Sequence, residues 1–145
     1  MNRQLLARVS LSFLCGLQGF ATLAIDFNRT HATNPTWARH ARFHVVWQSV
    51  SVALLSVLEL ILIWLQGPYQ RESFYLALLL AAISPLAFLI AFVGLKTYGG
   101  ALSDPNGIPP VRLKLFRVVL SIDLNLAAIA AALVSIGVIL EIYSR

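Results

Sequence analysis

The chain has 145 residues, of which 59% are hydrophobic and 12% charged, and its mean hydropathy is +0.79. A soluble domain carries roughly a quarter of its residues as charged side chains, so this composition excludes an ordinary water-soluble globule. Eleven Lys and Arg oppose six Asp and Glu. Because most of these charges lie between apolar runs, they indicate contact with lipid head groups rather than nucleic-acid binding. We expect the lipid bilayer as a partner, and no nucleic acid.

Four apolar runs follow one another along the chain, and each is long enough to cross about 30 Å of hydrocarbon at about 1.5 Å per residue. They predict an all-α polytopic membrane protein with a single domain over residues 1–145. The expected four-helix transmembrane bundle has helices at about 5–25, 35–66, 73–97 and 111–143. Gly67-Pro68 predicts a tight turn between the second and third helices.

The connection into the second helix carries an unusual run of residues. Asn34 precedes Pro35, which is typical of a helix start, because Asn caps free backbone N–H groups and Pro at the first position needs none. We therefore expect the second helix to begin at Pro35 outside the hydrocarbon. Trp37 and Trp47 would then mark the membrane interface.

All three histidines lie in this same region, close to Asp26. His40 and His44 are four residues apart, which places them on one face of a helix. This spacing suits a transition metal, and His31 and Asp26 would complete its ligands. Two alternatives stay open. The histidines would bind lipid phosphates and loop carbonyls, or they would act as acid and base without a metal.

Polar residues also interrupt the apolar runs. Glu59 and Asp123 lie within the expected second and fourth helices, where an ionised carboxyl group costs several kcal/mol unless it faces a partner. The predicted catalytic residues are His40, His44, Asp26, Glu59 and Asp123, and the predicted substrate-binding residues are Gln48, Trp47, Gln18 and Asn125. The alternative for the two buried acids is structural: hydrogen bonding that fixes the packing of the helices.

The connection before the fourth apolar run combines turn residues with basic ones. Asp104-Pro105-Asn106-Gly107 indicates a turn. In the following stretch Leu113 and Phe116 would enter lipid, while Arg112 and Lys114 would stay in water. Seven Lys and Arg flank or occupy the two long connections, and four lie near the termini and the short turn. The positive-inside rule therefore predicts cytoplasmic long loops.

The run N-P-x-W-x-x-H-x-R-F-H-x-V-W-Q, from Asn34 to Gln48, resembles a motif of short, uncharacterised four-helix bacterial integral membrane proteins. The resemblance covers about a tenth of the chain. It implies an inner-membrane location and carries no activity, cofactor or substrate with it.

The first functional hypothesis is a membrane-embedded enzyme that acts on an isoprenoid, quinone or lipid-like substrate. The His/Asp group at the membrane interface would move protons or, with a metal, polarise an oxygen atom. The alternatives are an accessory subunit of a larger membrane complex, as a homo- or hetero-oligomer, and a small proton- or cation-coupled transporter. An enzyme predicts polar residues that face a pocket within one protomer. A subunit predicts an outward small-residue face, for which the fourth helix offers Ala127, Ala128, Ala130, Ala131 and Ala132.

Overall fold

The computed structural model describes residues 2–116 and 118–145, and in them four helical stretches are long and apolar enough to cross a membrane. This confirms the predominantly helical fold. The first stretch runs without interruption through α1 (Arg3–Gly16), the π-helical segment η1 (Leu17–Ala21) and α2 (Thr22–Asp26). The others are α3 (Arg39–Trp64), α4 (Gln70–Val93) and α5 (Leu124–Ser144). The 3-10 turn η2 (Leu95–Thr97) and the strands β1 (Val111–Leu115) and β2 (Val118–Ile122) lie between α4 and α5.

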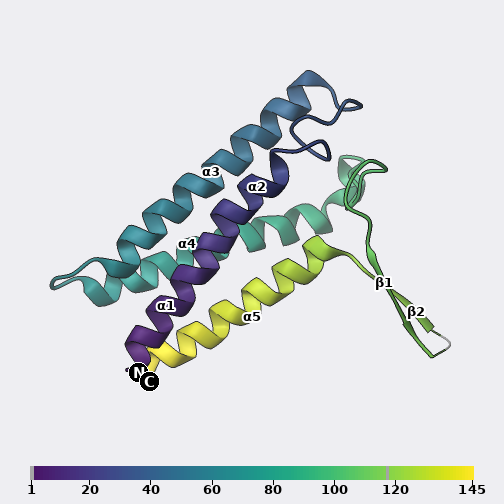
Figure 1. The fold of residues 1–145 in the computed structure, drawn as a ribbon. Helices are drawn as coiled ribbons and strands as arrows, with labels where there is room; N and C mark the ends of the chain where they lie inside the picture. Colours follow the sequence, from purple (N-terminus) through teal and green to yellow (C-terminus); the bar gives the residue numbers. More distant parts are fainter. Residues whose placement is uncertain (1, 117) are drawn as a thin grey trace.

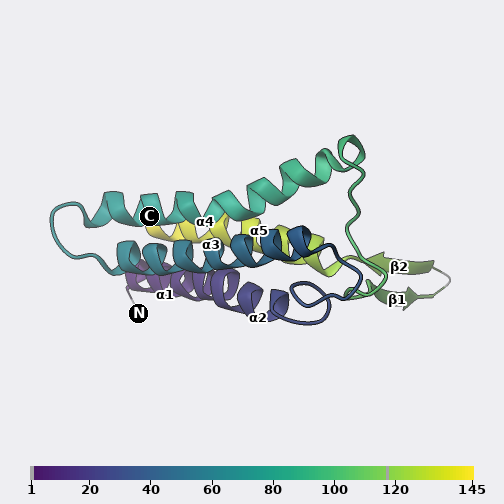
Figure 2. The same cartoon turned by 90° about the horizontal axis from the view of Figure 1, so that it is seen from above.

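The two ends of the bundle differ in structure (Figures 1 and 2). Both termini and the short turn between α3 and α4 lie at one end, and the two long connections lie at the other. α1 and α5 meet at the end that holds the termini and separate toward the other end, with α4 behind them. The helices are therefore splayed at the end that carries the long connections.

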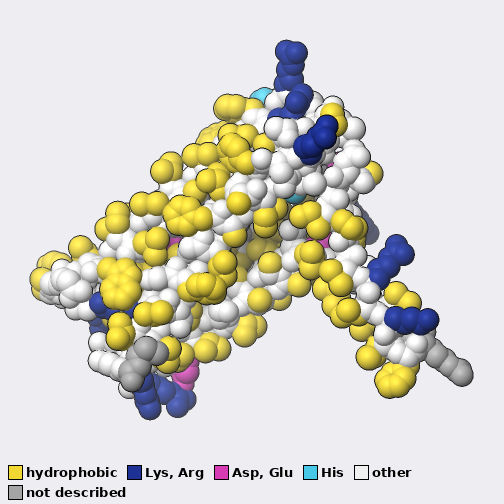
Figure 3. Space-filling view, viewed as in Figure 1, with side chains coloured by type: hydrophobic (Ala, Val, Ile, Leu, Met, Phe, Trp, Pro, Cys, Tyr) yellow, Lys and Arg dark blue, Asp and Glu magenta, His cyan; other side chains and the backbone are white. Residues whose placement is uncertain are grey.

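The apolar core lies toward the end that holds the termini. Its largest fully buried side chains include Leu11, Ile63 and Phe74. The Phe74 ring stacks on Tyr143 of α5 with 3.7 Å between the ring centroids, which joins α4 to the last turn of α5. The outer surface is also largely apolar (Figure 3), as expected of helices whose surroundings are lipid.

α1 and α3 approach each other closely where η1 passes α3. A side chain at Gly19 would overlap the side chain of Ser56 and lie 3.3 Å from the Cα atom of Ala53. Small residues allow such close contact between membrane helices. The glycine is therefore needed for the position of η1, the segment that carries Gln18.

α3 begins four residues later than expected, at Arg39 rather than Pro35. The Asn34 side chain accepts hydrogen bonds from both the backbone N–H and the hydroxyl group of Thr36, at 3.0 and 2.8 Å. It thus caps an isolated turn, and the extended backbone of Ala38 separates that turn from the helix. His40 and His44 remain on one helix, as expected.

The helix expected over 111–143 is wrong in its first third, because β1 and β2 form an antiparallel hairpin there and α5 begins only at Leu124. The sequence from Val111 to Leu115 alternates apolar and basic residues, which is the period of a strand. Asp123 then starts the helix: its Oδ1 atom accepts the Leu126 N–H at 3.0 Å. An N-cap at this position ends the strand and fixes the first turn of α5.

Candidate functional site

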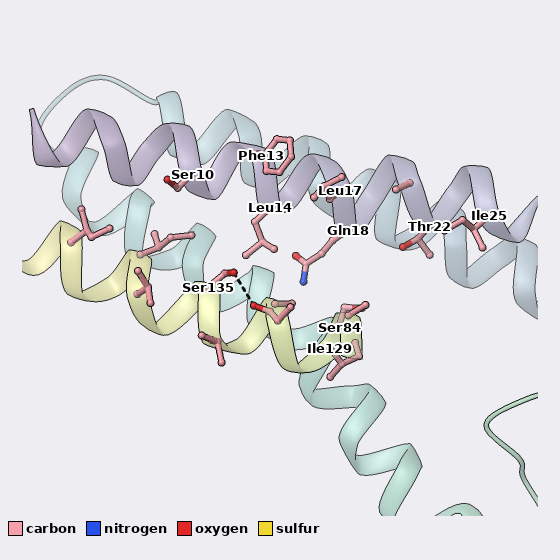
Figure 4. Close-up of a pocket in the computed structure, with 18 residues that line it drawn as sticks. Ser10, Phe13, Leu14, Leu17, Gln18, Thr22, Ile25, Ser84, Ile129 and Ser135 are labelled. Carbon is pink, nitrogen blue, oxygen red and sulfur yellow. Dashed lines mark hydrogen bonds between the residues drawn. The ribbon is translucent and has the colours of Figure 1, made fainter. Parts of the chain in front are cut away.

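A groove of about 690 Å³ runs between the first helical stretch and α5, with Ser84 of α4 in its lining. Its walls are mainly apolar. Leu14, Leu17 and Ile25 contribute from one side, and the small residues Ala128 and Ala131 from the other. Figure 4 shows the labelled residues of the first stretch opposite α5, with Gln18 between the two. The groove follows from the splay of the helices, because α1 and α5 pack together at the end that holds the termini and separate toward the other end (Figure 1).

Gln18 makes a specific contact at the bottom of this groove. Pro85, inside α4, has no N–H to donate to the carbonyl group four residues earlier. That carbonyl belongs to Ala81, and the Gln18 side-chain amide donates to it at 3.2 Å. The predicted substrate-binding residue Gln18 therefore lines a cavity and also satisfies the backbone acceptor that the proline leaves open.

A second cavity, of about 410 Å³, lies between the two long connections. Asp26, His31 and Asn125 line it together, so the structure brings three of the predicted site residues to one place. Ile25 lines both this cavity and the groove. The groove and the cavity therefore share a residue at the end of α2; the groove lining is mainly apolar, and the cavity lining mixes apolar residues with polar ones.

Hydrogen bonds join the two long connections around this cavity. The Trp37 indole N–H donates to Asp104 Oδ2 at 2.9 Å, and the Asn106 side-chain amide donates to the Thr36 hydroxyl at 3.3 Å. The indole, and then the Asn106 backbone N–H, stabilise the carboxylate and hold the pKa of Asp104 below its usual value. Asp104 is therefore ionised at neutral pH.

His31 is held with one ring nitrogen fixed. The Thr30 hydroxyl lies 2.5 Å from Asn28 Oδ1 and 2.8 Å from His31 Nδ1. Asn28 Oδ1 also accepts the Thr30 N–H, so this oxygen is an acceptor and the single hydroxyl proton goes to it. Nδ1 of His31 must then donate to the hydroxyl oxygen. A neutral His31 consequently carries its lone pair on Nε2 and is able to accept a proton there.

His40 and His44 form a separate pair on the outer surface of α3. Their Nε2 atoms are 3.0 Å apart, and both side chains are exposed. The rings belong to an exposed aromatic group with Phe43 and Trp47. Trp47 and Gln48 are exposed and do not line the groove or the cavity.

The predicted metal site and histidine cluster are not formed. Among residues 2–116 and 118–145, no three His, Cys, Asp or Glu side chains are placed to hold a metal ion. His31 and Asp26 line the cavity between the connections, whereas His40 and His44 face outward. The four-residue spacing correctly predicted that His40 and His44 lie together. The turn at Asn34 separates this pair from Asp26 and His31.

The two acids within the apolar runs lie outside the groove and the cavity. Glu59 is 2% exposed on α3, beside the Cys15 thiol of α1, and its Oε2 atom has no hydrogen-bond partner among the described residues. Asp123 caps α5. The structure therefore does not bring Glu59 or Asp123 to the cavity that holds Asp26, and their catalytic roles stay predictions.

Sequence reasoning missed the contact between Trp37 and Asp104, and with it the cavity between the long connections. The signal was weak: a Trp in one connection, and a turn-forming Asp in the other, were each assigned to a local role. No protein-family model, curated protein or solved structure matches this chain.

Proposed function

We propose that this is a membrane-embedded enzyme that binds a single-chain, lipid-like molecule, with the apolar chain in the groove and the polar head group in the adjoining cavity. The observation that carries the proposal is that Ile25 lines both the mainly apolar groove and the cavity that holds Asp26, His31 and Asn125. The groove volume of about 690 Å³ lies within the range of ligand sites, roughly 300–1,000 Å³.

The charge of the cavity favours one class of head group. Its described lining includes the carboxyl groups of Asp26 and Asp104 and contains no Lys or Arg. These carboxyl groups would repel a phosphate or carboxylate head group, and no Lys or Arg in this lining would offset the repulsion. A hydroxyl or carbonyl group would find hydrogen-bonding partners in Ser103 and Asn125. We therefore infer an uncharged head, as in an isoprenoid alcohol or a quinone.

Asp26 and His31 supply the chemistry in this proposal. Both line the cavity, and neutral His31 presents Nε2 as a base. A carboxyl group and an imidazole that line one cavity suit proton transfer to and from the head group, which is general acid–base catalysis. The apolar chain of the bound molecule would remain in the groove during the reaction, shielded from water.

The groove offers a matched pair of variants for testing. Ala127 and Ala128 are both exposed, but only Ala128 lines the groove. Ala128→Phe should lower the amount of amphiphile retained by the purified protein about tenfold, because the ring fills the space of the chain, and Ala127→Phe should retain the wild-type amount. The measurement is native mass spectrometry of the detergent-purified protein, with extraction and quantification of the bound molecule.

Chemistry is tested separately from binding. Asp26→Asn should retain the bound amphiphile but accumulate it unprocessed, so the extracts from wild-type and variant protein should contain chemically different molecules. Identical extracts would contradict the catalytic role of Asp26 and leave a binding protein. Equal retention of the amphiphile by the Ala128 and Ala127 variants would contradict binding in the groove. A bound polypeptide in place of an amphiphile would instead support the accessory-subunit alternative.

A further inference from the structure

The hairpin between α4 and α5 has two chemically different faces. Directly paired residues of an antiparallel hairpin lie on the same face. The register pairs Val111 with Ile122 and Leu113 with Leu120, which makes one face apolar, together with Leu115. The alternate positions pair Arg112 with Ser121 and Lys114 with Val119, so both of these cations lie on the other face. All of these side chains are exposed.

The position of the hairpin next to α5 determines which of its two faces is turned toward the membrane-spanning part of the bundle. Only Asp123 separates β2 from α5. Figure 1 shows that the hairpin leaves the end of α5 and runs across the direction of the helices rather than along it. In Figure 3 yellow side chains gather mainly on the lower left side of the hairpin, the side toward which α5 runs. The dark blue side chains lie toward the upper right. The apolar face is thus on the side of the bundle where hydrocarbon would begin.

An isolated two-stranded hairpin is marginally stable in water and needs another surface to pack on. Among the described residues no such surface covers this hairpin, since Leu113 is 50%, Leu115 59% and Phe116 91% exposed. The described hairpin residues contain no acid, and the cations Arg112 and Lys114 complement an anionic surface. A membrane interface with anionic lipids supplies both an apolar layer and negative head groups.

We propose that the hairpin of β1 and β2 lies in the head-group layer of an anionic leaflet, with its apolar face toward the acyl chains and Arg112 and Lys114 on lipid phosphates. This inference rests on the membrane-embedded bundle of the proposed function, but not on the ligand in the groove. The hairpin would hold the end of α5, and with it Asn125, at a fixed depth.

The experiment compares neighbouring labels on the full-length protein in vesicles of equal parts phosphatidylglycerol and phosphatidylcholine. An environment-sensitive fluorophore is attached to Leu113→Cys or to Lys114→Cys; Cys15 is 0% exposed, so wild type treated with the same reagent is the background control. Quenchers borne on the acyl chains should reach the label at 113, and aqueous iodide should reach the label at 114. Ile61→Cys, on the exposed face of α3, reports whether the bundle is in the bilayer.

A second arm tests the charges. Replacing Arg112 with Gln should lower the ratio of docked to undocked hairpin about fivefold in the anionic vesicles, since each basic side chain near such a surface contributes about 1 kcal/mol. The same substitution should have little effect in vesicles of phosphatidylcholine alone.

The outcomes separate this inference from the proposed function. The hairpin placement alone is overturned if iodide reaches the label at 113 as readily as the label at 114, while the acyl-chain quenchers reach the Ile61 label. An Ile61 label that the acyl-chain quenchers do not reach overturns the membrane-embedded bundle as well. A label at 113 that neither iodide nor the acyl-chain quenchers reach would indicate a protein partner on the strands and would likewise overturn the placement.

Discussion

At the scale of single residues, Gln18 supplies a hydrogen bond that Pro85 removes from α4. The proline removes the N–H that would bond the Ala81 carbonyl, and the Gln18 amide replaces it from another helix. An unpaired backbone carbonyl in hydrocarbon is unfavourable, so this bond accounts for a polar side chain at position 18 within an apolar helix. Gln18 contributes to the groove partly by fixing the position of α4 behind it.

This pairing predicts a coupled pair of substitutions. Gln18→Leu should destabilise the protein by about 1 kcal/mol, the size typical of hydrogen bonds between membrane helices. In a Pro85→Ala background the same change should cost less, because the restored backbone N–H at position 85 would bond the Ala81 carbonyl within α4. The measurement is a double-mutant cycle of unfolding free energies in mixed micelles. Equal costs in both backgrounds would show that Gln18 is not acting through Ala81.

At the scale of elements, the two long connections are tied by Trp37 and Asp104. The pKa of Asp104 is lowered in the folded protein, so the stabilisation is present above the unfolded value of about 4 and is lost as the pH falls through the folded pKa. Near pH 7 the connections should be joined; the contact should begin to weaken as the pH falls below about 4 and should be lost only as the pH falls through the lower pKa of Asp104 in the folded protein.

Asp104→Asn should remove this acid-induced transition and weaken the contact already at neutral pH. The measurement is the intensity and wavelength of the Trp37 emission as a function of pH, in a protein whose Trp47 and Trp64 are replaced by Phe. Ser103→Ala serves as the control, because it alters the neighbouring residue and leaves the carboxylate in place. A transition that survives in the Asp104 variant would assign the pH dependence to another group.

The elements also show which parts of the structure the sequence predicted. Hydropathy and length located four helical stretches, because these properties act over about twenty residues. The start of α3 was misplaced because Asn34 caps a helix and a single turn with the same hydrogen bonds. The hairpin was missed because its apolar strands were read as the beginning of α5. The alternation from Val111 to Leu115 and the capping residue Asp123 were the signals that could have corrected this.

The candidate site depended on information that no local pattern holds. The grouping of Asp26 with Asn125 depends on a cavity between the ends of α2 and α5 that both long connections line, and the groove depends on the separation of the first helical stretch from α5. The histidine spacing was sufficient to pair His40 with His44, but not to show that the pair faces outward.

At the scale of the whole molecule, both long connections lie at one end of the bundle and both termini at the other. We predict that the end with the long connections is cytoplasmic, from the excess of basic residues there. Thr33→Cys and Ser103→Cys should then resist a membrane-impermeant thiol reagent in intact cells and react after permeabilisation. Reaction of both in intact cells would show the inverted orientation, and reaction of one alone would contradict the four-span topology.

The splay of α1 from α5 has a consequence for how a ligand would be supplied. The groove lies between the first helical stretch and α5, which would both be surrounded by lipid, so a lipid-like molecule would enter by lateral diffusion in the leaflet without passing through water. Occupancy would then depend on the mole fraction of the ligand among the lipids rather than on its aqueous concentration. Diluting the membrane with inert lipid at constant total ligand should empty the site, whereas diluting the sample with buffer should leave it filled.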